Sequence, residues 1–311
     1  MKFKFKSAIH WFDSDYESKD CATGEEQVDL ARCMSLVFMH AGCFGVIWVG
    51  WSWFALAIAL AFYIVRMFVV TAFLHRYFSH RTFKTSRFMQ FIFAVLTSTT
   101  VQRGALWWAS KHRKHHQESD KKNDIHSPHT HSFIWSHIAW IASPKNFATD
   151  YSAIKDFAKY RELVFLNRYN KLVPALMAVG LYFSGNWAAS AWPSLQTSGA
   201  QILVWGFFVS TTILFHGTAT INSLSHLYGR QRFDTGDKSR NNFWLAVITL
   251  GEGWHNNHHH YMHSTRQGFY WWEIDPTYYG LKVMSWLGLV YDLKPVPQQI
   301  LEEGISNDSK K

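Results

Sequence analysis

The sequence has few of the residues that build covalent frameworks. Its 311 residues include three cysteines, Cys21, Cys33 and Cys43, an odd number confined to the N-terminal part. They predict neither a disulfide framework nor a Cys-based metal site. The basic N-terminus, MKFKFK, is not followed by a short apolar segment with a cleavage site, so we expect no removable signal peptide. Prolines number only seven, and no repeat or low-complexity linker occurs, which favours one integrated domain.

Uniformly high hydrophobicity is also missing. The mean hydropathy is −0.13, although 48% of the residues are hydrophobic. This favours a minority of membrane-spanning helices joined to a large polar part. A span needs to cross about 30 Å of hydrocarbon at ~1.5 Å per residue. Four segments are predicted to do so: 34–50, 52–74, 172–190 and 201–221. A fifth apolar run, 88–102, would reach only about 22 Å and is predicted to be interfacial or re-entrant.

The basic residues are distributed unevenly around these predicted spans. Five Lys or Arg precede the first span, 16 lie between the second and third, and nine follow the fourth. The short loop between the first and second predicted spans and the one between the third and fourth carry no Lys or Arg. Arg66 alone lies inside a predicted span. The positive-inside rule therefore predicts that both termini and the large middle segment are cytoplasmic. The net charge of +9 is then explained by membrane orientation, without nucleic acid as a partner.

Histidine, by contrast, is abundant and clustered beside the apolar segments. Two clusters have i, i+3, i+4 spacing, which places three imidazoles on one face of a helix. The third cluster is a pair five residues apart, about 140° around an ideal helix, so either the helix ends or distorts there or each histidine serves a different metal. Eight histidines are too many for one ion but enough for two. The clusters are His75 and His80; His112, His115 and His116; and His255, His258 and His259.

Other polar residues near these clusters suit supporting roles. Asn222 and His226 form an i, i+4 pair just beyond the fourth predicted span. Glu252, Asp120 and Asp124 are placed to orient ligand histidines by accepting a hydrogen bond. The group His126, His129, His131 and His137 lacks ligand spacing and is predicted to be surface-exposed or to support the ligands. His40 and His216 are predicted to be packed side chains, His260 to point away from its cluster, and His263 to lie on the surface.

Four motifs give the chain a specific resemblance. It resembles the membrane acyl-CoA desaturases, the stearoyl-CoA (Δ9) desaturase family, from about the second span to Asp292. The three histidine motifs in this order are typical of the membrane desaturases and hydroxylases. The GEGWHN context of the third motif and the pair Asn222 and His226 narrow the resemblance to the acyl-CoA desaturase branch. The motifs are HRYFSHRTF at 75–83, HRKHH at 112–116, NSLSH at 222–226 and GEGWHNNHH at 251–259.

The resemblance implies a fold and a site. The fold is an all-α integral membrane protein, with four transmembrane helices under a cytosolic, histidine-rich helical cap that holds two ferrous ions. The expected organisation is an N-terminal segment at 1–33, a desaturase domain at 34–292 and a C-terminal tail at 293–311. Gln102, Trp108 and Thr218 match residues beside a kinked acyl tunnel, while Glu252, Asp124 and His126 support the ligands. The implied ligands are His75, His80, His112, His115, His116, His226, His255, His258 and His259, with Asn222 reaching one iron through water.

The resemblance also implies an activity and its partners. The reaction uses dioxygen to leave a cis double bond, at Δ9, in a saturated acyl chain. Two electrons must come from a separate ferredoxin, cytochrome b5 or reductase, because the chain has no flavin or nicotinamide fingerprint. Ser110 and Lys111 replace an Arg-Asp pair that contacts CoA in animal relatives, so a lipid-linked or carrier-protein substrate stays open beside CoA. We expect a multi-pass protein of a bacterial inner membrane rather than of the endoplasmic reticulum.

Two alternatives remain at this stage. One is a membrane di-iron lipid or alkane hydroxylase, which would release an alcohol instead of an alkene. The other is a zinc-binding transporter or sensor, which would place ionisable ligands inside the spans along a path. The histidine clusters lie outside the predicted spans, which favours an enzyme. Product analysis separates a desaturase from a hydroxylase, and metal analysis with oxygen uptake separates either from a transporter.

Overall fold

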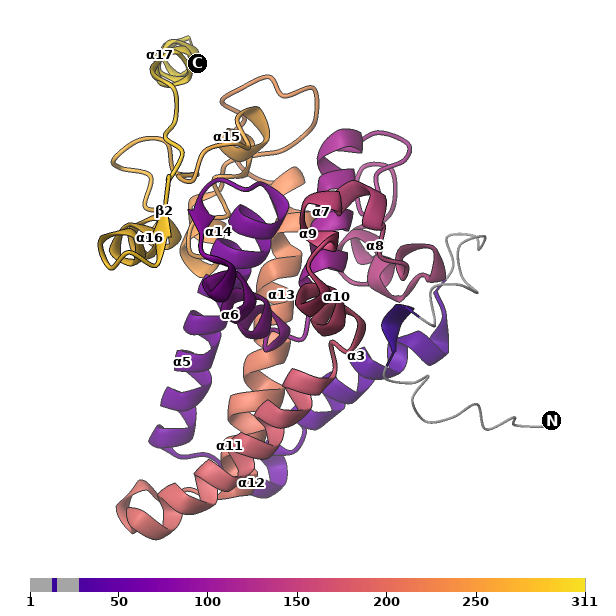
Figure 1. Ribbon diagram of the computed structural model, residues 1–311, viewed down its shortest axis with the longest axis vertical. Coiled ribbons are helices and arrows are strands. Elements are labelled where there is room, and N and C mark those ends of the chain that lie inside the picture. Colours follow the sequence, from indigo (N-terminus) through magenta and orange to yellow (C-terminus); the bar gives the residue numbers. More distant parts are fainter. Residues whose placement is uncertain (1–12, 16–27, 311) are drawn as a thin grey trace, which may run out of the picture.

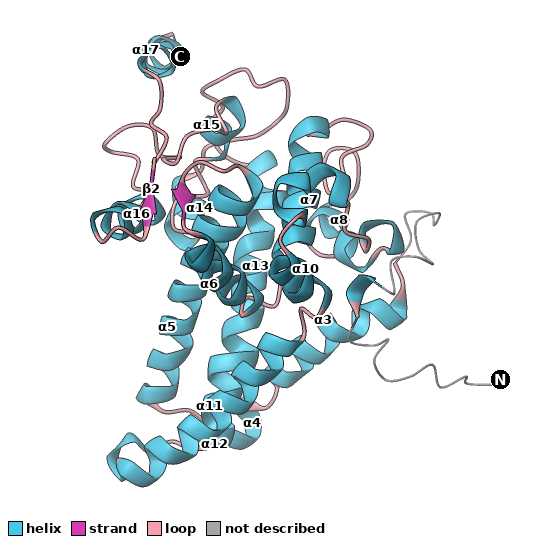
Figure 2. Ribbon diagram, viewed as in Figure 1, coloured by secondary structure: helices cyan, strands magenta, loops and turns pink. Residues whose placement is uncertain are grey.

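The structure is a computed structural model that describes residues 13–15 and 28–310. Cys21 and four of the N-terminal lysines lie outside the described residues. Long helices extend from one end of the molecule, and short helices form a cap at the other end (Figure 1). Figure 2 shows that helices dominate both parts. The described residues contain one small sheet, in which β1 (Lys84–Thr85) pairs antiparallel with β2 (Val290–Tyr291). The predicted all-α class is therefore confirmed for the described part of the chain.

Three continuous helical segments are long and apolar enough to cross a membrane. In the first, Trp53–Ser79, α5 (Trp53–Val69) continues directly into the π-helix η1 (Val70–Ser79). The second is α11 (Leu172–Ala191). The third, Gly199–His226, joins α12 (Gly199–Leu203), the π-helix η6 (Val204–Val209), α13 (Ser210–Ser223) and the 3-10 turn η7 (Leu224–His226). The first and third segments extend past the predicted spans into the cap.

The first predicted span, 34–50, is not confirmed. This region forms α3 (Leu30–Cys43) and α4 (Val46–Val49), which are separated by a turn at Phe44 and Gly45. Its apolar part, Cys33–Val49, reaches only about 26 Å at ~1.5 Å per residue, which is less than the hydrocarbon thickness. A topology with four spans therefore remains a prediction. The run at 88–102 forms α6 (Arg87–Ser98), whose 12 residues are too short to span, as predicted.

Arg66 is the one basic side chain within α5, and neutral groups satisfy it. The side chain is buried, and its guanidinium donates to Ser210 Oγ at 2.5 Å and Thr211 Oγ1 at 2.6 Å on the third segment. It also donates to the backbone oxygens of Phe62 and Thr99. A buried cation is costly unless its donors are paired. Arg66 therefore ties the first spanning segment to the third and to the end of α6.

Short helices of the cap surround the ends of the first and third spanning segments. A buried core of Phe73, Phe78, Phe93, Leu106 and Leu214 joins η1 to α6, α7 and α13. The cap helices are α7 (Ala105–Glu118), α8 (Phe133–His137), α9 (Lys155–Ala158), α10 (Arg161–Arg168), α14 (Phe243–Ile248), α15 (His255–His260) and α16 (Pro276–Trp286). The 3-10 turns are η2 (Ala139–Ala142), η3 (Pro144–Asn146), η4 (Tyr151–Ile154) and, between α11 and α12, η5 (Pro193–Leu195).

The predicted C-terminal tail contains a docked helix. α17 (Gln298–Ser309) lies against the cap, where Asp308 pairs with Arg232 at 3.0 Å. The hydroxyl of Tyr270 donates to the Leu301 carbonyl at 2.8 Å. Gly304 is buried so closely against Tyr270 that a Cβ there would collide with the Tyr270 hydroxyl. The described residues after 293 are therefore part of the folded cap.

Candidate metal centre

Nine histidines gather in the cap as two adjacent groups. In each group, one nitrogen of every ring lies within 4.8 Å of one nitrogen of every other ring. Five of the rings are contributed by η1 and its end, α7 and α15, and four by α7, η7 and α15. The first group is His75, His80, His112, His116 and His258, and the second is His115, His226, His255 and His259. These are the nine histidines that the family resemblance implies as ligands, and the structure brings all of them together.

The π-helix η1 resolves the spacing of His75 and His80. In a π-helix each backbone N–H bonds to the carbonyl five residues earlier, so residues five apart stack on one face. His80 N donates to His75 O at 3.2 Å, and the two ring centres lie 4.9 Å apart. Of the sequence's alternatives, the distorted helix is therefore the one the structure shows. Both rings belong to the first histidine group.

The two helical clusters divide their rings between the groups. On α7, His112 and His116 face the first group and His115 faces the second. On α15 the order is reversed, because His255 and His259 face the second group and His258 the first. Residues i and i+4 differ by only about 40° around a helix, whereas i+3 lies about 60° to the other side. One helical face can therefore serve two adjacent ions.

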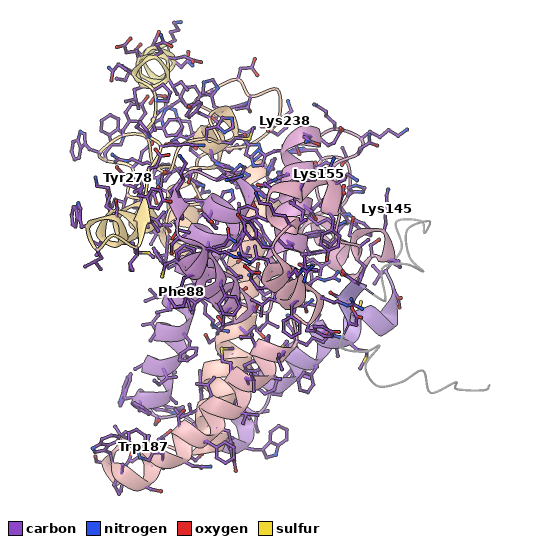
Figure 3. The ribbon with its side chains drawn as sticks, viewed as in Figure 1. Phe88, Lys145, Lys155, Trp187, Lys238 and Tyr278 are labelled. Carbon is purple, nitrogen blue, oxygen red and sulfur yellow. The ribbon has the colours of Figure 1, made fainter. Side chains whose placement is uncertain are left out.

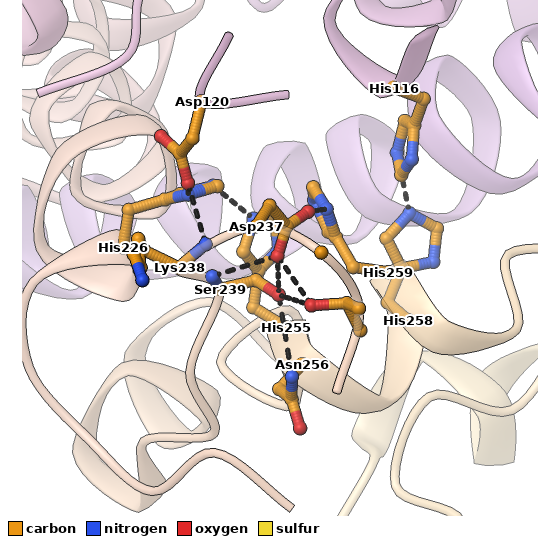
Figure 4. A network of polar contacts seen from close by, with 12 residues as sticks. His116, Asp120, His226, Asp237, Lys238, Ser239, His255, Asn256, His258 and His259 are labelled. Atoms are coloured by element: carbon orange, nitrogen blue, oxygen red, sulfur yellow. Dashed lines mark hydrogen bonds and ion pairs between the residues drawn. The ribbon is translucent and has the colours of Figure 1, made fainter. Parts of the chain in front are cut away.

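Carboxylates fix the orientation of four of these rings, and Figure 4 shows two of these carboxylates, Asp120 and Asp237. Asp124 lies 3.0 Å from His115 Nδ1, Asp120 lies 2.8 Å from His226 Nδ1, and Asp237 lies 2.6 Å from His259 Nδ1. Glu252 contacts His75 Nδ1 in the same way. An ionised carboxylate can only accept, so each Nδ1 must carry the proton. The Nε2 lone pair of each ring then points into its group.

The carboxylates are ionised near neutral pH. Burial raises the pKa of Asp120, but hydrogen bonds from His226, Ser127 and Lys238 outweigh it and hold that pKa at about 2. For Asp124 and Asp237 the same opposition holds, and the paired histidines keep each pKa well below its ordinary value. These carboxylates therefore act as permanent acceptors behind the imidazoles.

The Nε2 atoms approach one another more closely than unprotonated nitrogens should. The Nε2 of His258 lies 3.0 Å from that of His75 and 3.0 Å from that of His116. In the second group, the Nε2 atoms of His226 and His255 are 3.0 Å apart. A metal–imidazole bond is about 2.0–2.1 Å, so two ligands at right angles on one ion would be about 3.0 Å apart. The donor arrangement therefore fits a bound cation in each group.

Burial keeps most of these rings neutral, as metal ligands must be. Burial, reinforced by the neighbouring rings, holds the pKa of His80, His112 and His116 well below the ordinary value. The pKa values of His255 and His258 are lowered for the same reason. His255 Nδ1 and His259 Nε2 are buried without a hydrogen-bond partner among the described residues. A nitrogen-rich donor set suits iron, zinc or another transition metal better than magnesium or calcium.

Two adjacent cavities lie between the histidine groups and the membrane helices. The first is lined by Met67, Val70 and Thr71 as well as by four of the clustered histidines. The second includes Gln102 and Lys111 in its lining. Trp108, His112, Thr218 and Asn222 line both cavities, so they mark the junction. An apolar chain in this space would pass directly beneath the histidine rings.

The residues predicted to line an acyl tunnel meet at this junction. Gln102 Nε2 donates to Thr218 Oγ1 at 2.9 Å, across from the ring of Trp108. Trp108 stacks on His112, with ring centres 4.9 Å apart. Burial, with the nearby Lys114 and Arg103 adding to it, lowers the pKa of Lys111 to about 8.

The remaining predicted residues fall into distinct positions. His126 is buried, and with His115 and Asp124 it forms a third close set of possible ligands. His260 is turned away from both groups, since it stacks on Phe233 at 4.0 Å and contacts Glu303. Asp237 was missed in the sequence, because it lies 22 residues before His259 in a loop without helical spacing to any ligand. No local pattern could have identified it.

We expect two metal ions per chain in protein purified from its native host. The reason is that nine imidazoles form two groups, each with converging Nε2 atoms. The measurement is metal content per chain by inductively coupled plasma mass spectrometry, alongside activity, because overexpression can substitute zinc for another metal. One metal per chain in a fully active sample would contradict a dinuclear site.

Comparison with known proteins places this site in a family context. The family model described as "Fatty acid desaturase" matches residues 51–285. The chain is 37% identical over 259 residues to "Acyl-CoA 5-desaturase AL21" of Anemone leveillei, covering 82% of this chain and 76% of the relative. It is 34% identical to the "sn-1 stearoyl-lipid 9-desaturase" of Synechocystis sp., covering 79% and 74%. It is 32% identical to the chloroplastic "palmitoyl-monogalactosyldiacylglycerol delta-7 desaturase" of Arabidopsis thaliana, covering 94% and 73%.

Proposed function

The chain belongs to the fatty acid desaturase family and is therefore an oxygen-dependent oxidoreductase that acts on acyl chains. We propose that it uses two irons to introduce a cis double bond at Δ9 of a saturated acyl chain. The observation that carries this proposal is the pair of cavities that passes beneath both histidine groups. A site that opened only toward the solvent would not suit an acyl chain. Relatives named as 9-desaturases of stearoyl or palmitoyl lipids support the position Δ9, although others are named for positions 5 and 7.

The residues of the chain supply positioning rather than redox chemistry. Bound iron would supply the activation of dioxygen and the removal of two hydrogen atoms from adjacent methylenes. Within the protein, Asp124 and Glu252 hold His115 and His75 in one tautomer. The apolar walls hold the acyl chain beneath the histidines and limit access of water. Asn222 is placed at the junction between the two cavities, where it can hold a water for the second group.

We also propose that 34–50 crosses the membrane, giving four spans, because only an even number of spans leaves the site and both termini together on the cytoplasmic side of a bacterial inner membrane. Figure 3 shows Lys145, Lys155 and Lys238 on the cap and Trp187 near the opposite end of the long helices. This separation of basic residues from interfacial aromatics fits the positive-inside rule. A separate one-electron carrier protein, of ferredoxin or cytochrome b5 type, would dock on the basic cap. The acyl group would be lipid-linked or carried by CoA.

The direct test is to express the chain in a host that lacks this activity. Gas chromatography with mass spectrometry of host lipids should reveal a new cis monounsaturated acyl chain, and derivatisation locates the double bond. A double bond at another carbon would overturn Δ9 while leaving desaturation intact. An alcohol as the product would instead indicate a hydroxylase.

Changing the bulk at Thr218 should change the product profile while the metals are retained. Thr218→Leu places extra volume at the junction of the cavities, and it removes the hydroxyl that accepts from Gln102. The position of the double bond depends on how the chain packs between its anchored end and the metals. We expect at least a several-fold shift in the ratio of accepted chain lengths, measured by gas chromatography of lipids from expressing cells.

Thr220→Leu is the matched control for this experiment. Thr220 lies on the same helix, α13, and lines neither cavity. Its product profile should match that of the wild type. An unchanged profile at wild-type rate for Thr218→Leu would place Thr218 outside the acyl path.

A further inference from the structure

Three histidines outside the two metal groups are joined into a chain by hydrogen bonds. His40 on α3 and His216 on α13 face each other, with their Nε2 atoms 3.0 Å apart. The other ring nitrogen of His216, Nδ1, lies 3.0 Å from Nε2 of His137 on α8. All three rings are half-buried. His216 uses both of its nitrogens for neighbours, whereas ligand rings in the metal groups converge through one nitrogen. The arrangement therefore suits proton exchange rather than metal binding.

Backbone carbonyls close both ends of this chain. His40 Nδ1 lies 2.7 Å from Leu36 O. At the other end, His137 Nδ1 lies 2.9 Å from Ser223 Oγ, and the Ser223 hydroxyl lies 2.9 Å from Ala219 O. A carbonyl oxygen can only accept a hydrogen bond. The hydrogens for every contact must therefore come from the three imidazoles and the serine hydroxyl.

Counting hydrogens shows how many protons the hydrogen-bonded chain of His40, His216, His137 and Ser223 needs. There are five contacts, from Leu36 O through the three rings and Ser223 to Ala219 O, and each requires one hydrogen. Three neutral imidazoles and one hydroxyl carry one hydrogen each, which makes four. A neutral chain therefore leaves one contact without a hydrogen, and one excess proton satisfies all five. A second excess proton would force two donors to face each other.

The surroundings of the three hydrogen-bonded histidines make their one excess proton easy to release. His137 and His40 are the titratable groups that act electrostatically on His216. α3 adds the thiol of Cys43, whose Sγ lies 3.3 Å from Thr212 Oγ1 on α13. Burial lowers the pKa of His137 below its ordinary value. A proton held mainly by hydrogen bonds, and opposed by burial, can move between the rings and leave.

The end of the chain at Ser223 lies beside the candidate active site. Ser223 follows Asn222, which lines both cavities, and Ser136 Oγ, from the residue before His137, donates to Asn222 O at 2.9 Å. Leu36 and Ala219, whose carbonyls close the chain, also line the second cavity. Both ends of the hydrogen-bonded chain therefore lie at the wall of that cavity, while its three rings lie behind the lining.

We propose that His40, His216 and His137 form a one-proton store that supplies the adjacent cavity with protons consumed in dioxygen reduction. This rests on the proposed function. Reducing dioxygen to two waters takes four electrons and four protons. Two hydrogen atoms from adjacent methylenes bring two of each, and the external one-electron carrier brings the other two electrons in two steps. Two protons must therefore enter from outside the substrate, and the chain delivers them singly and reloads.

The store itself is tested without any activity. Protein labelled with ¹⁵N-histidine in lipid nanodiscs is titrated by solid-state nuclear magnetic resonance, and the wild type is compared with His216→Leu, which leaves three contacts and three hydrogens and so needs no excess proton. The store predicts a difference of one bound proton between the two proteins and a neutral His40 protonated at Nδ1. Independent titration of the three rings, or a neutral His40 protonated at Nε2, would overturn it. This result stands even if the wild type proves not to be a desaturase.

The supply role is tested by turnover and its solvent isotope effect. His216→Gln retains hydrogen-bonding capacity, but the glutamine amide cannot take up a proton on one side and release one on the other as an imidazole can. We expect turnover to fall at least about tenfold, with a larger effect of D₂O and unchanged metal content and thermal stability. A merely structural residue would change stability without changing the isotope effect. The exposed His263, changed to Gln, is the control and should behave as wild type. Wild-type turnover and isotope effect in a folded, metal-loaded His216→Gln would refute the supply role.

Discussion

Replacing His258 by Ala is expected to abolish desaturation and to empty or weaken the first histidine group. His258 Nε2 lies 3.0 Å from the Nε2 atoms of both His75 and His116, so its loss removes the ring that joins η1 to α7. Activity should fall below detection, by at least about a hundredfold, because every later step depends on this group. Membrane insertion should persist, since the three long apolar segments are unchanged. Metal content and product formation are measured on the same purified sample.

His260→Ala is the control for that variant. His260 is two residues away on the same helix, but it stacks on Phe233 and contacts Glu303 instead of a ligand. Its loss should cost some stability in the packing of α17 and leave metal content and product profile unchanged. Loss of activity and metal in His260→Ala, with retention of both in His258→Ala, would show that the helical phase of α15 is wrong.

The candidate ligand histidines were accessible from the sequence because their signal is local. Spacings of three and four residues place rings such as His112 and His116 side by side whatever the rest of the fold does. The three long apolar segments were accessible for a similar reason, since length and composition decide them. The region 34–50 shows the limit, because its apolar composition does not reveal the turn at Gly45 that interrupts the helix.

The division of rings between the two groups could not be predicted in this way. It depends on how α7 and α15 face each other across η1, which is a property of the assembled cap. The π-helix is a partial case, because the five-residue spacing of His75 and His80 raised a distorted helix as one alternative but could not select it. Polar partners from distant loops, such as Asp237, are invisible for the same reason. Their role exists only once the loop has folded against the ligands.

Asp237→Asn is expected to weaken metal binding at the second histidine group by about 10- to 100-fold, the usual effect of losing the partner behind a ligand. Asp237 Oδ2 lies 2.6 Å from His259 Nδ1, and both side chains are buried. Asparagine retains the shape and an acceptor oxygen but removes the charge that fixes the tautomer and strengthens the Nε2 lone pair. The measurement is retention of metal against a graded series of chelator concentrations, with activity assayed at each step.

A control in the same loop separates this effect from loop folding. Asp234 is exposed, and its Oδ1 accepts from Gly236 N rather than from a ligand histidine. Asp234→Asn should therefore hold metal as tightly as the wild type. Asp237 Oδ1 also accepts from Ser239 N and Thr235 Oγ1, so the thermal stability of the metal-free proteins must be compared. Wild-type metal retention in a stable Asp237→Asn protein would mean that the charge behind His259 is not needed, and that packing alone holds this ring in place.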